Sequence, residues 1–446
     1  MNLDAREIAA ATGGVLLRQG AAGPVVTDSR DLLAGAWFLA LRGERFDGHN
    51  YVASAFAAGA GGVVVDCEPN SPAGGVVVVS DTLVALQDLG RFARNRFTGP
   101  VVGLTGSAGK TTTRALIAAA IDGPFCVHQT VGNLNNHIGV PLTLLATPSA
   151  ANVLVVELGT SSPGEIGLLA EITRPTVRLV VNVGPAHLLE LGGLSGVAKE
   201  KCALYDAAQP GDVAVVNQDD PWLVGAAIPS GVRRISFGEH PDADVRLESA
   251  VVDTESLETK ATFATPQGGV SATLPVPGRH LALDAAAALA IAFSLGLDLH
   301  ESASRLATYR PVGMRQRIER NDAGFVVIND AYNANPSSME AALRVLADLP
   351  GRRIAVLGDM LELGADELEW HRKLLGWVLS LQLDYVVVCG PRMGAVAPPG
   401  VVACTDSEAA VAALRGHVRR GDTVLVKGSR GARMERVAAA LADGEV

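Results

Sequence analysis

The sequence predicts an α/β protein of three domains whose sheets are mostly parallel, and three features of the chain support this fold class. Strand-like apolar runs alternate with helix-length segments nearly throughout, as in domains built on parallel sheets. A β-forming run at 101–104 is followed by a glycine-rich turn and an alanine-rich helix. The last third alternates most regularly and indicates a Rossmann-like, doubly wound sheet.

The first predicted domain is small, covers 1–98 and ends near the sequence RFTGP. Its expected elements are strands at 36–41, 61–66 and 74–79 and a helix at 51–59. The second, central domain covers 99–312. Its expected strands lie at 101–104, 152–158, 177–183 and 212–217, and its last helix at about 280–296. Between them, 232–238 and the polar segment 241–275 are expected to form smaller antiparallel elements.

The third predicted domain covers 313–446 and repeats a strand followed by a helix. Its expected strands are 324–330, 352–359, 384–390 and 422–428. Its expected helices are 337–349, 366–381, 407–418 and 431–442. This is the pattern of a doubly wound sheet, in which ligands bind where the strands end.

Composition narrows the class of protein. The chain has 446 residues, 48% of them hydrophobic, and a net charge of −10, which argues against a nucleic-acid binder. Five cysteines without a C-x-x-C pair argue against a zinc site or a disulfide framework and suit a reducing compartment. The N-terminus has no apolar signal core, and no apolar run has the length of a membrane span. We therefore expect a cytoplasmic protein that is not inserted in a membrane.

The stretch VVGLTGSAGKTTTRALIAAA, 101–120, predicts a phosphate-binding loop. Gly106 and Gly109 permit a tight turn whose N–H groups point at an anion, and the following helix adds its positive dipole end. Lys110 would reach the terminal phosphates, and a threonine hydroxyl would hold magnesium. The usual glycine five positions before Gly109 is replaced by Leu104, so an ordinary βα turn is the alternative. The strand, the helix and the Lys-Thr-Thr sequence favour nucleotide binding.

Three residues of the central domain sit where strands should end or just beyond. Glu157 closes an apolar strand, His187 follows VVNVGPA, and Lys201 lies fourteen positions later. A carboxylate at such an edge suits magnesium, which prefers oxygen ligands. The structural alternatives are a solvated acid for Glu157, a turn histidine for His187 and a helix-surface lysine for Lys201.

Polar residues also gather in three loops. They are Asn133, Asn135 and Asn136 in GNLNNHIGVP, Asp330, Asn333 and Asn335 in NDAYNANPSSM, and Lys427, Ser429 and Arg430 in VKGSR. Each loop has an ordinary explanation, because asparagine is common in turns and helix N-termini often carry polar groups. Two such loops in the third domain favour a binding face there.

These segments together resemble the Mur ligase family, ATP-dependent amide-forming enzymes of peptidoglycan precursor synthesis. The resemblance extends over the whole chain, from TDSRDLLAGAWFLALRGERFDGHNYV through TGSAGKTTT and NVGPAH to DAYNANP and LGDMLELG. DAYNANP and the long RGERFDGH segment are most similar to the member that joins D-alanyl-D-alanine to UDP-N-acetylmuramoyl-tripeptide. The resemblance implies ATP and Mg²⁺ as cofactors, these two substrates as partners, and phosphorylation of the tripeptide carboxylate before the amine attacks. We expect a monomer.

The resemblance also implies roles for individual residues. Lys110, Glu157, His187 and Lys201 would be catalytic; Thr111, Glu157, His187 and a carbamylated Lys201 would hold magnesium. The implied ATP contacts are Thr105, Gly106, Ser107, Ala108, Gly109, Lys110, Thr111, Thr112, Arg315, Asp330 and Asn333. The implied substrate contacts are Ser29 and Arg30 at the uridine, with Arg45, Asn135, Asn136, Asn335, Lys427, Ser429 and Arg430.

The sequence departs from the family pattern beside the expected adenine. Leu281 and Asp284 stand where asparagines are usual, so an altered adenine pocket is expected. Ser161-Ser162 replaces an Asn-His pair, and Ala203 a glutamate. The alternatives are a sister amino-acid-adding ligase or folylpolyglutamate synthase, a catalytically impaired nucleotide-sugar-binding relative, and a small-molecule kinase. The kinase is distinguished by whether phosphate release requires an amine acceptor.

Overall fold

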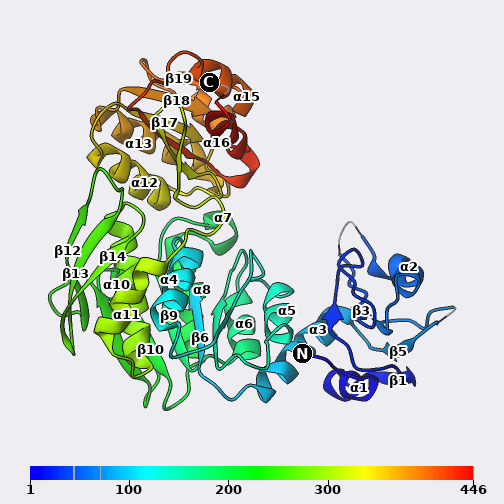
Figure 1. Ribbon diagram of the computed structural model, residues 1–446. Helices are drawn as coiled ribbons and strands as arrows, with labels where there is room; N and C mark the ends of the chain where they lie inside the picture. The colour runs from blue at the N-terminus through cyan, green and yellow to red at the C-terminus, as the bar shows by residue number, and fades with distance from the viewer. Residues whose placement is uncertain (44–45, 71, 445) are drawn as a thin grey trace.

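The computed structural model describes residues 1–43, 46–70, 72–444 and 446, and it contains three sheets in succession along the chain (Figure 1). The predicted α/β class with mostly parallel sheets is confirmed. Each sheet and its helices are called below the N-terminal, central and C-terminal domain; the boundaries at 98 and 312 stay predictions. No helix in the described ranges is both long and apolar enough to cross a membrane.

The N-terminal sheet has five strands in the order β1-β5-β4-β3-β2, and only β1 runs antiparallel to its neighbour. Its last helix, α3, packs against α5 and α6 and so attaches this domain to the central one (Figure 1). The elements are α1 (Ala5–Thr12), β1 (Val15–Arg18), β2 (Val25–Val26), β3 (Trp37–Leu39), η1 (Gly48–Tyr51), α2 (Val52–Ala57), β4 (Gly62–Val65), β5 (Gly75–Val78) and α3 (Thr82–Arg96).

The central sheet has nine strands in the order β14-β13-β12-β11-β10-β9-β6-β8-β7. Its first half comprises β6 (Val101–Thr105), α4 (Lys110–Ile121), β7 (Val127–Gln129), α5 (Gly139–Leu145), β8 (Val153–Glu157), α6 (Glu165–Thr173), β9 (Val177–Val180), α7 (Leu188–Leu191) and α8 (Leu194–Asp206). Its second half comprises β10 (Val213–Asn217), α9 (Pro221–Val224), β11 (Arg233–Gly238), β12 (Val245–Val252), β13 (Thr259–Thr265), β14 (Gly268–Leu274), α10 (Arg279–Ser294), α11 (Leu299–Arg305) and η2 (Leu306–Thr308).

The prediction for 232–238 is wrong, because this segment is not a separate antiparallel element. Strand β11 pairs in parallel with both β10 and β12, and only β12, β13 and β14 are antiparallel to one another. The physical reason is the connection before β11, which passes through α9 and returns the chain to the starting edge of the sheet. A crossover of this kind gives a parallel strand, whereas a tight hairpin would have given an antiparallel one.

The C-terminal sheet has six strands in the order β15-β16-β20-β17-β18-β19, and only β15 is antiparallel. The prediction missed β15, α14 and β19, which are short. The elements are β15 (Arg317–Arg320), β16 (Val326–Asp330), α12 (Pro336–Asp348), β17 (Arg353–Gly358), η3 (Gly364–Asp366), α13 (Glu367–Ser380), β18 (Tyr385–Cys389), α14 (Pro391–Ala395), β19 (Val402–Cys404), α15 (Ser407–Leu414), β20 (Thr423–Lys427), η4 (Arg430–Ala432) and α16 (Glu435–Ala442).

Helices cover both faces of the C-terminal sheet, as a doubly wound fold requires. Helices α12, α13 and α14 share one buried cluster with the strands, and α15 and α16 share another. The neighbouring strands β17 and β20 lead to opposite faces, β17 to α13 and β20 to α16. A crevice is expected where two such connections diverge, at the carboxyl ends of the strands.

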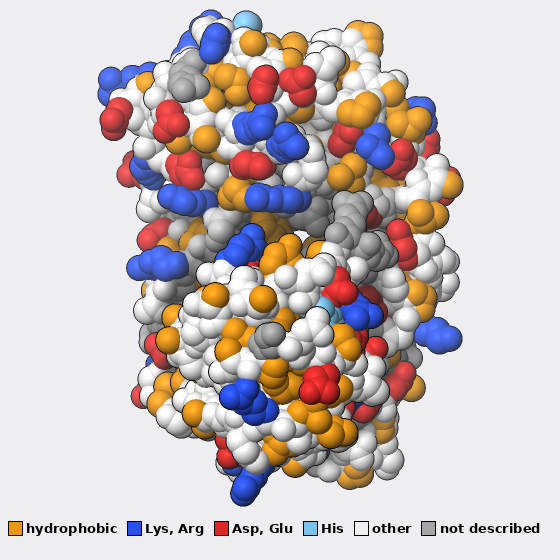
Figure 2. Space-filling view, turned by 90° about the vertical axis from the view of Figure 1, so that its right-hand side faces the viewer, with side chains coloured by type: hydrophobic (Ala, Val, Ile, Leu, Met, Phe, Trp, Pro, Cys, Tyr) orange, Lys and Arg blue, Asp and Glu red, His pale blue; other side chains and the backbone are white. Residues whose placement is uncertain are grey.

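The face of the molecule shown in Figure 2 is hollowed between its upper and lower parts. Lysine and arginine side chains border this hollow, although the chain as a whole carries a net charge of −10. A basic border on an acidic protein focuses positive potential on one place and attracts anionic ligands.

Candidate active site

The glycine-rich turn joins β6 to α4, and Asn182 holds its shape. The Asn182 Oδ1 atom accepts hydrogen bonds from the N–H groups of Ser107 (3.1 Å) and Ala108 (3.0 Å), and its amide donates to the Ala108 carbonyl. Gly109 has φ 79°, a left-handed conformation that favours glycine. Asn182 follows β9, the strand beside β6. Sequence reasoning missed this residue, although it lies in the quoted NVGPAH segment.

The Lys110 side chain folds back over the loop. Its Nζ donates to the Gly106 carbonyl at 2.7 Å. Burial lowers the pKa of Lys110; the Glu157 carboxylate opposes this shift and the Arg315 guanidinium adds to it. Two cations therefore converge at the loop, and an anionic ligand there would relieve both desolvation and repulsion.

Glu157 is buried at the end of β8, so the alternative of a solvated strand-end acid is wrong. Its carboxylate accepts from the Thr111 hydroxyl at 2.8 Å and from the Asn135 amide at 2.9 Å. Each carboxylate oxygen thus has one donor and keeps further acceptor capacity. The hydroxyl and carboxylate oxygens form a hard donor set, and this chemistry fits Mg²⁺.

Lys201 lies on α8 with only 2% of its surface exposed, so the alternative of a helix-surface lysine is wrong. Burial lowers its pKa well below the usual value of 10.5, and the nearby Lys110 cation lowers it further. In the described ranges, no side chain makes a hydrogen bond or ion pair with its amine. An amine whose pKa is lowered by burial gives up its proton more readily than an exposed ammonium group, and the deprotonated amine is the nucleophile.

His187 lies just before α7 and is half-buried, with φ 53°. Its Nδ1 atom is 3.0 Å from Oε2 of Glu362, a residue of the C-terminal domain. The sequence did not single out Glu362, which belongs to the quoted LGDMLELG segment. Among the described side chains, the ionic partner of His187 is Glu362.

The C-terminal domain brings Arg315 toward the phosphate loop. The Arg315 guanidinium stacks over the Tyr332 ring, 3.7 Å from its centroid, and acts electrostatically on Lys110. The Asp330 carboxylate forms an ion pair with Lys427, whose ammonium nitrogen lies 2.5 Å from Asp330 Oδ2. These two residues were predicted as separate nucleotide and substrate contacts, and the structure pairs them with each other.

Several of the predicted asparagines have structural partners. Asn136 accepts from the N–H groups of Ile138 and Gly139 at the entry to α5. Asn335 forms a capping box with Ser338 at α12. The Asn335 amide also donates to the Ser107 carbonyl at 3.2 Å, which ties the C-terminal domain to the phosphate loop.

The other predicted contacts are spread more widely. Ser429 donates to the Ala334 carbonyl and accepts from the Leu361 N–H, so it joins two loops. The Asn333 side chain accepts from the next backbone N–H. Arg430 is exposed, and Arg30 is exposed and paired with Asp28. Ser29 is half-buried beside Arg30, and Arg45 lies outside the described residues.

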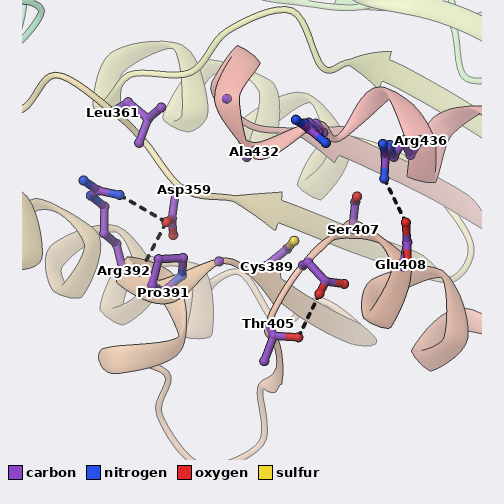
Figure 3. A pocket seen from close by; sticks show the side chains of 14 residues that line it. Asp359, Leu361, Cys389, Pro391, Arg392, Thr405, Ser407, Glu408, Ala432 and Arg436 are labelled. Atoms are coloured by element: carbon purple, nitrogen blue, oxygen red, sulfur yellow. Dashed lines mark hydrogen bonds and ion pairs between the residues drawn. The ribbon is translucent and has the colours of Figure 1, made fainter.

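A cavity of about 450 Å³ opens at the divergence of β17 and β20 (Figure 3). Asp359 and Asp406 line it from the segments after β17 and β19, and Arg392 lines it from α14. Arg433 and Arg436 line it from the segment after β20 and from α16. Arg392 is paired with Asp359 and Glu367, and Arg436 with Glu408. Arg433 has no ion-pair partner in the part of the chain that is described. Sequence reasoning missed this crevice, because it depends on strand order.

Asp284 packs directly against the phosphate loop from α10. A Cβ atom at position 109 would lie only 3.1 Å from Asp284 Oδ1. Burial raises the pKa of Asp284 to about 7, and a hydrogen bond with Thr113 opposes the shift. Burial and the nearby Asp284 carboxyl raise the pKa of Tyr309.

Three family models match the chain. They are described as "Mur ligase family, catalytic domain" over 24–88, "Mur ligase middle domain" over 104–292, and "Mur ligase, glutamate ligase domain" over 314–430. The chain is 35% identical to the UDP-N-acetylmuramoyl-tripeptide–D-alanyl-D-alanine ligase of Bacillus subtilis, covering 93% of this chain and 92% of the relative. It is 36% identical to the Escherichia coli enzyme of the same name, covering 94% and 93%.

Solved structures agree with these relatives. A crystal structure of MurF from Acinetobacter baumannii matches with TM-score 0.92 and 32% identity over 99% of both chains. MurF of Thermotoga maritima in complex with ADP matches with TM-score 0.85 and 30% identity, covering 94% of this chain and 97% of that one. Folylpolyglutamate synthase from Mycobacterium tuberculosis, at 17% identity, shares the fold only.

Asp284→Asn should remove a pH-dependent cost in stability. The folded-state pKa of Asp284 is raised to about 7, so the wild-type protein loses stability as pH rises from the unfolded value near 3.8 toward 7. Relative to wild type, the variant should therefore gain about 2–3 kcal/mol between pH 5 and pH 8. Urea unfolding at both pH values measures this gain, and an equal difference at both would contradict it.

Proposed function

The chain belongs to the Mur ligase family, and we infer that it is the ATP-dependent ligase that adds D-alanyl-D-alanine to UDP-N-acetylmuramoyl-tripeptide in peptidoglycan precursor synthesis. The observation that carries this inference is the phosphate loop at the junction of two domains. Lys110 lies over this loop, and the DAYNANP segment donates to it through Asn335. This junction brings the ATP-binding loop to the domain whose sequence resembles the dipeptide-adding member.

The reaction forms an amide bond in two steps. The terminal carboxylate of the tripeptide attacks the γ-phosphorus of ATP, which gives an acyl phosphate and ADP. The amine of D-alanyl-D-alanine then attacks the acyl carbon, loses a proton, and inorganic phosphate leaves. Negative charge develops on the transferring phosphoryl oxygens, so a preorganised cation such as Lys110 is the main protein contribution.

We propose that Lys110 binds the β- and γ-phosphates and that Arg315 approaches them from the C-terminal domain. The free N–H groups at the start of α4 would complete the phosphate cradle, because the N–H groups of Ser107 and Ala108 are already used by Asn182. Arg315 adds positive charge only while the C-terminal domain is docked, which couples phosphate binding to domain position.

We propose that Thr111, Glu157 and a carbamylated Lys201 hold Mg²⁺, with His187 at a second ion. Bound Mg²⁺ would neutralise charge on the phosphoryl oxygens. The Lys201 amine can add to CO₂ and release one proton, which creates a carbamate with anionic oxygens. Its burial and lowered pKa support this step, because only the neutral amine attacks CO₂.

We propose that the dipeptide enters the crevice at the divergence of β17 and β20. A zwitterionic dipeptide needs a cation for its carboxylate and an acid for its ammonium group, and the crevice offers Arg433 and Asp406. Hydrogen bonds link its wall to the phosphate loop. The Leu361 N–H donates to Ser429, whose hydroxyl donates to the Ala334 carbonyl, and the next residue, Asn335, donates to the Ser107 carbonyl.

Phosphate release from ATP should require both UDP-N-acetylmuramoyl-tripeptide and D-alanyl-D-alanine, and Lys110→Ala should lower it about 10²–10³-fold. Lys110 is half-buried at the start of α4, beyond the carboxyl end of β6, so the variant should stay folded. Steady-state phosphate assays with each substrate omitted in turn, together with circular dichroism, measure both results. ADP formation without the dipeptide and without phosphate release would favour a kinase, and no turnover in the wild-type protein would favour the catalytically impaired relative.

Lys201→Ala should lose most activity, and short carboxylic acids should partly restore it by supplying the missing oxygens. Lys199→Ala is the matched control, because Lys199 lies two residues earlier on α8 and is exposed; it should keep wild-type activity. Turnover is measured with and without formate, acetate and propionate. Wild-type activity in Lys201→Ala would remove this lysine from the mechanism.

Arg433→Ala should raise the KM for D-alanyl-D-alanine about tenfold and leave the KM for ATP unchanged, because a charged hydrogen bond contributes about 1.5–3 kcal/mol. Arg415→Ala is the control, since Arg415 is exposed near the end of α15 and does not line the crevice. Initial rates with each substrate varied separately give both constants. Parallel changes in the two KM values would place the dipeptide elsewhere.

A further inference from the structure

Two residues with left-handed backbone conformations meet between the central and C-terminal domains. His187 has φ 53° and Glu362 has φ 64°, and His187 Nδ1 lies 3.0 Å from Glu362 Oε2. Such conformations are uncommon for residues other than glycine and cost free energy, so they persist where the surrounding structure enforces them. Both residues of this contact have left-handed backbone conformations, which indicates that the surrounding structure holds the contact in place.

The segments that carry these residues are packed closely together. Helix α7 begins directly after His187 and contacts η3, which begins two residues after Glu362. Gly364 has φ 75°, and a Cβ atom there would lie 3.4 Å from the Leu189 backbone nitrogen. Figure 1 shows α7 immediately beside the C-terminal domain. The close approach fixes where Glu362 can place its carboxylate.

The pair contributes little to stability, since the Glu362 side chain is 59% exposed and solvent screens an exposed ion pair. Its effect is on orientation. The Glu362 carboxylate lies where it can accept from Nδ1–H of His187. A carboxylate that accepts from Nδ1–H leaves the lone pair of the imidazole on Nε2, which is the arrangement of metal-binding histidines with a carboxylate partner.

We propose that Glu362 is a positioning residue: its carboxylate fixes the tautomer and ring orientation of His187, so that docking of the C-terminal domain prepares this imidazole to bind the active-site cation. The inference rests on the proposed role of His187 at a metal ion. It adds that the cation site, although built from central-domain residues, is completed by an acid of another domain.

Mn²⁺ is a paramagnetic probe for this site and allows a readout other than turnover. Binding of Mn²⁺ to the full-length protein with a non-hydrolysable ATP analogue is measured by electron paramagnetic resonance, and pulsed spectra report ¹⁴N coupling from a ligated histidine. Glu362→Ala should weaken Mn²⁺ binding about 10–100-fold and reduce the ¹⁴N signal. Glu362→Gln should lose less, because its amide oxygen can still accept from Nδ1–H.

Two further variants make the result decisive. Asp366→Ala is the matched control, an exposed acid in the same segment, and should bind Mn²⁺ as the wild type does. His187→Ala should lose the ¹⁴N signal. If His187→Ala changes neither affinity nor spectrum, the proposed metal role of His187 is wrong and the inference falls with it. If His187→Ala shows the loss and Glu362→Ala does not, only the inference is overturned.

Small-angle scattering separates positioning from docking. A radius of gyration equal to that of the wild type, together with weakened Mn²⁺ binding in Glu362→Ala, supports the positioning role. A larger radius of gyration in Glu362→Ala overturns it, because Glu362 would then act as a docking contact.

Discussion

The placement of two lysine side chains beside one another is the constraint on which the rest of the site depends. Lys201 is buried and Lys110 is half-buried, and desolvation lowers the pKa of each. Lys110 further depresses the pKa of Lys201, and Arg315 that of Lys110. A fold does not gain stability from such an arrangement. Anions such as nucleotide phosphates or a carbamate would stabilise this arrangement, because their negative charge would neutralise the two neighbouring lysine cations.

The surrounding protein is organised to hold these cations in place. Asn182 shapes the loop, and Glu157 is oriented by Thr111 and Asn135. The C-terminal domain contributes Asn335 to Ser107 and Arg315 to the field at Lys110. The site is therefore divided between two domains, which gives large substrates a way in and lets docking exclude water from a reactive acyl phosphate.

One departure from the family pattern, Asp284, lies beside the phosphate loop, and Lys110, Glu157, His187 and Lys201 are all retained. Asp284 is buried against Gly109, where an ionised carboxylate would repel a nucleotide. Its pKa of about 7 keeps much of it protonated near neutral pH, so this acid can be tolerated there. In the crevice after β17 and β20, Arg392 and Arg436 are already paired with acids. Among the described residues Arg433 has no ion-pair partner, so it is the arginine able to bind a ligand.

The sequence by itself determined the α/β class, the phosphate loop, the buried strand that ends in Glu157 and the family. These follow from local patterns, because a strand, a glycine turn and a helix lie within twenty consecutive residues. Tertiary structure alone decided that β11 is parallel, that Lys201 is buried, that Asp330 is paired with Lys427, and that Glu362 meets His187. Asn182 and the crevice belong to the same group. Each joins residues distant in the chain, and such contacts depend on strand order and domain docking, which no local pattern encodes.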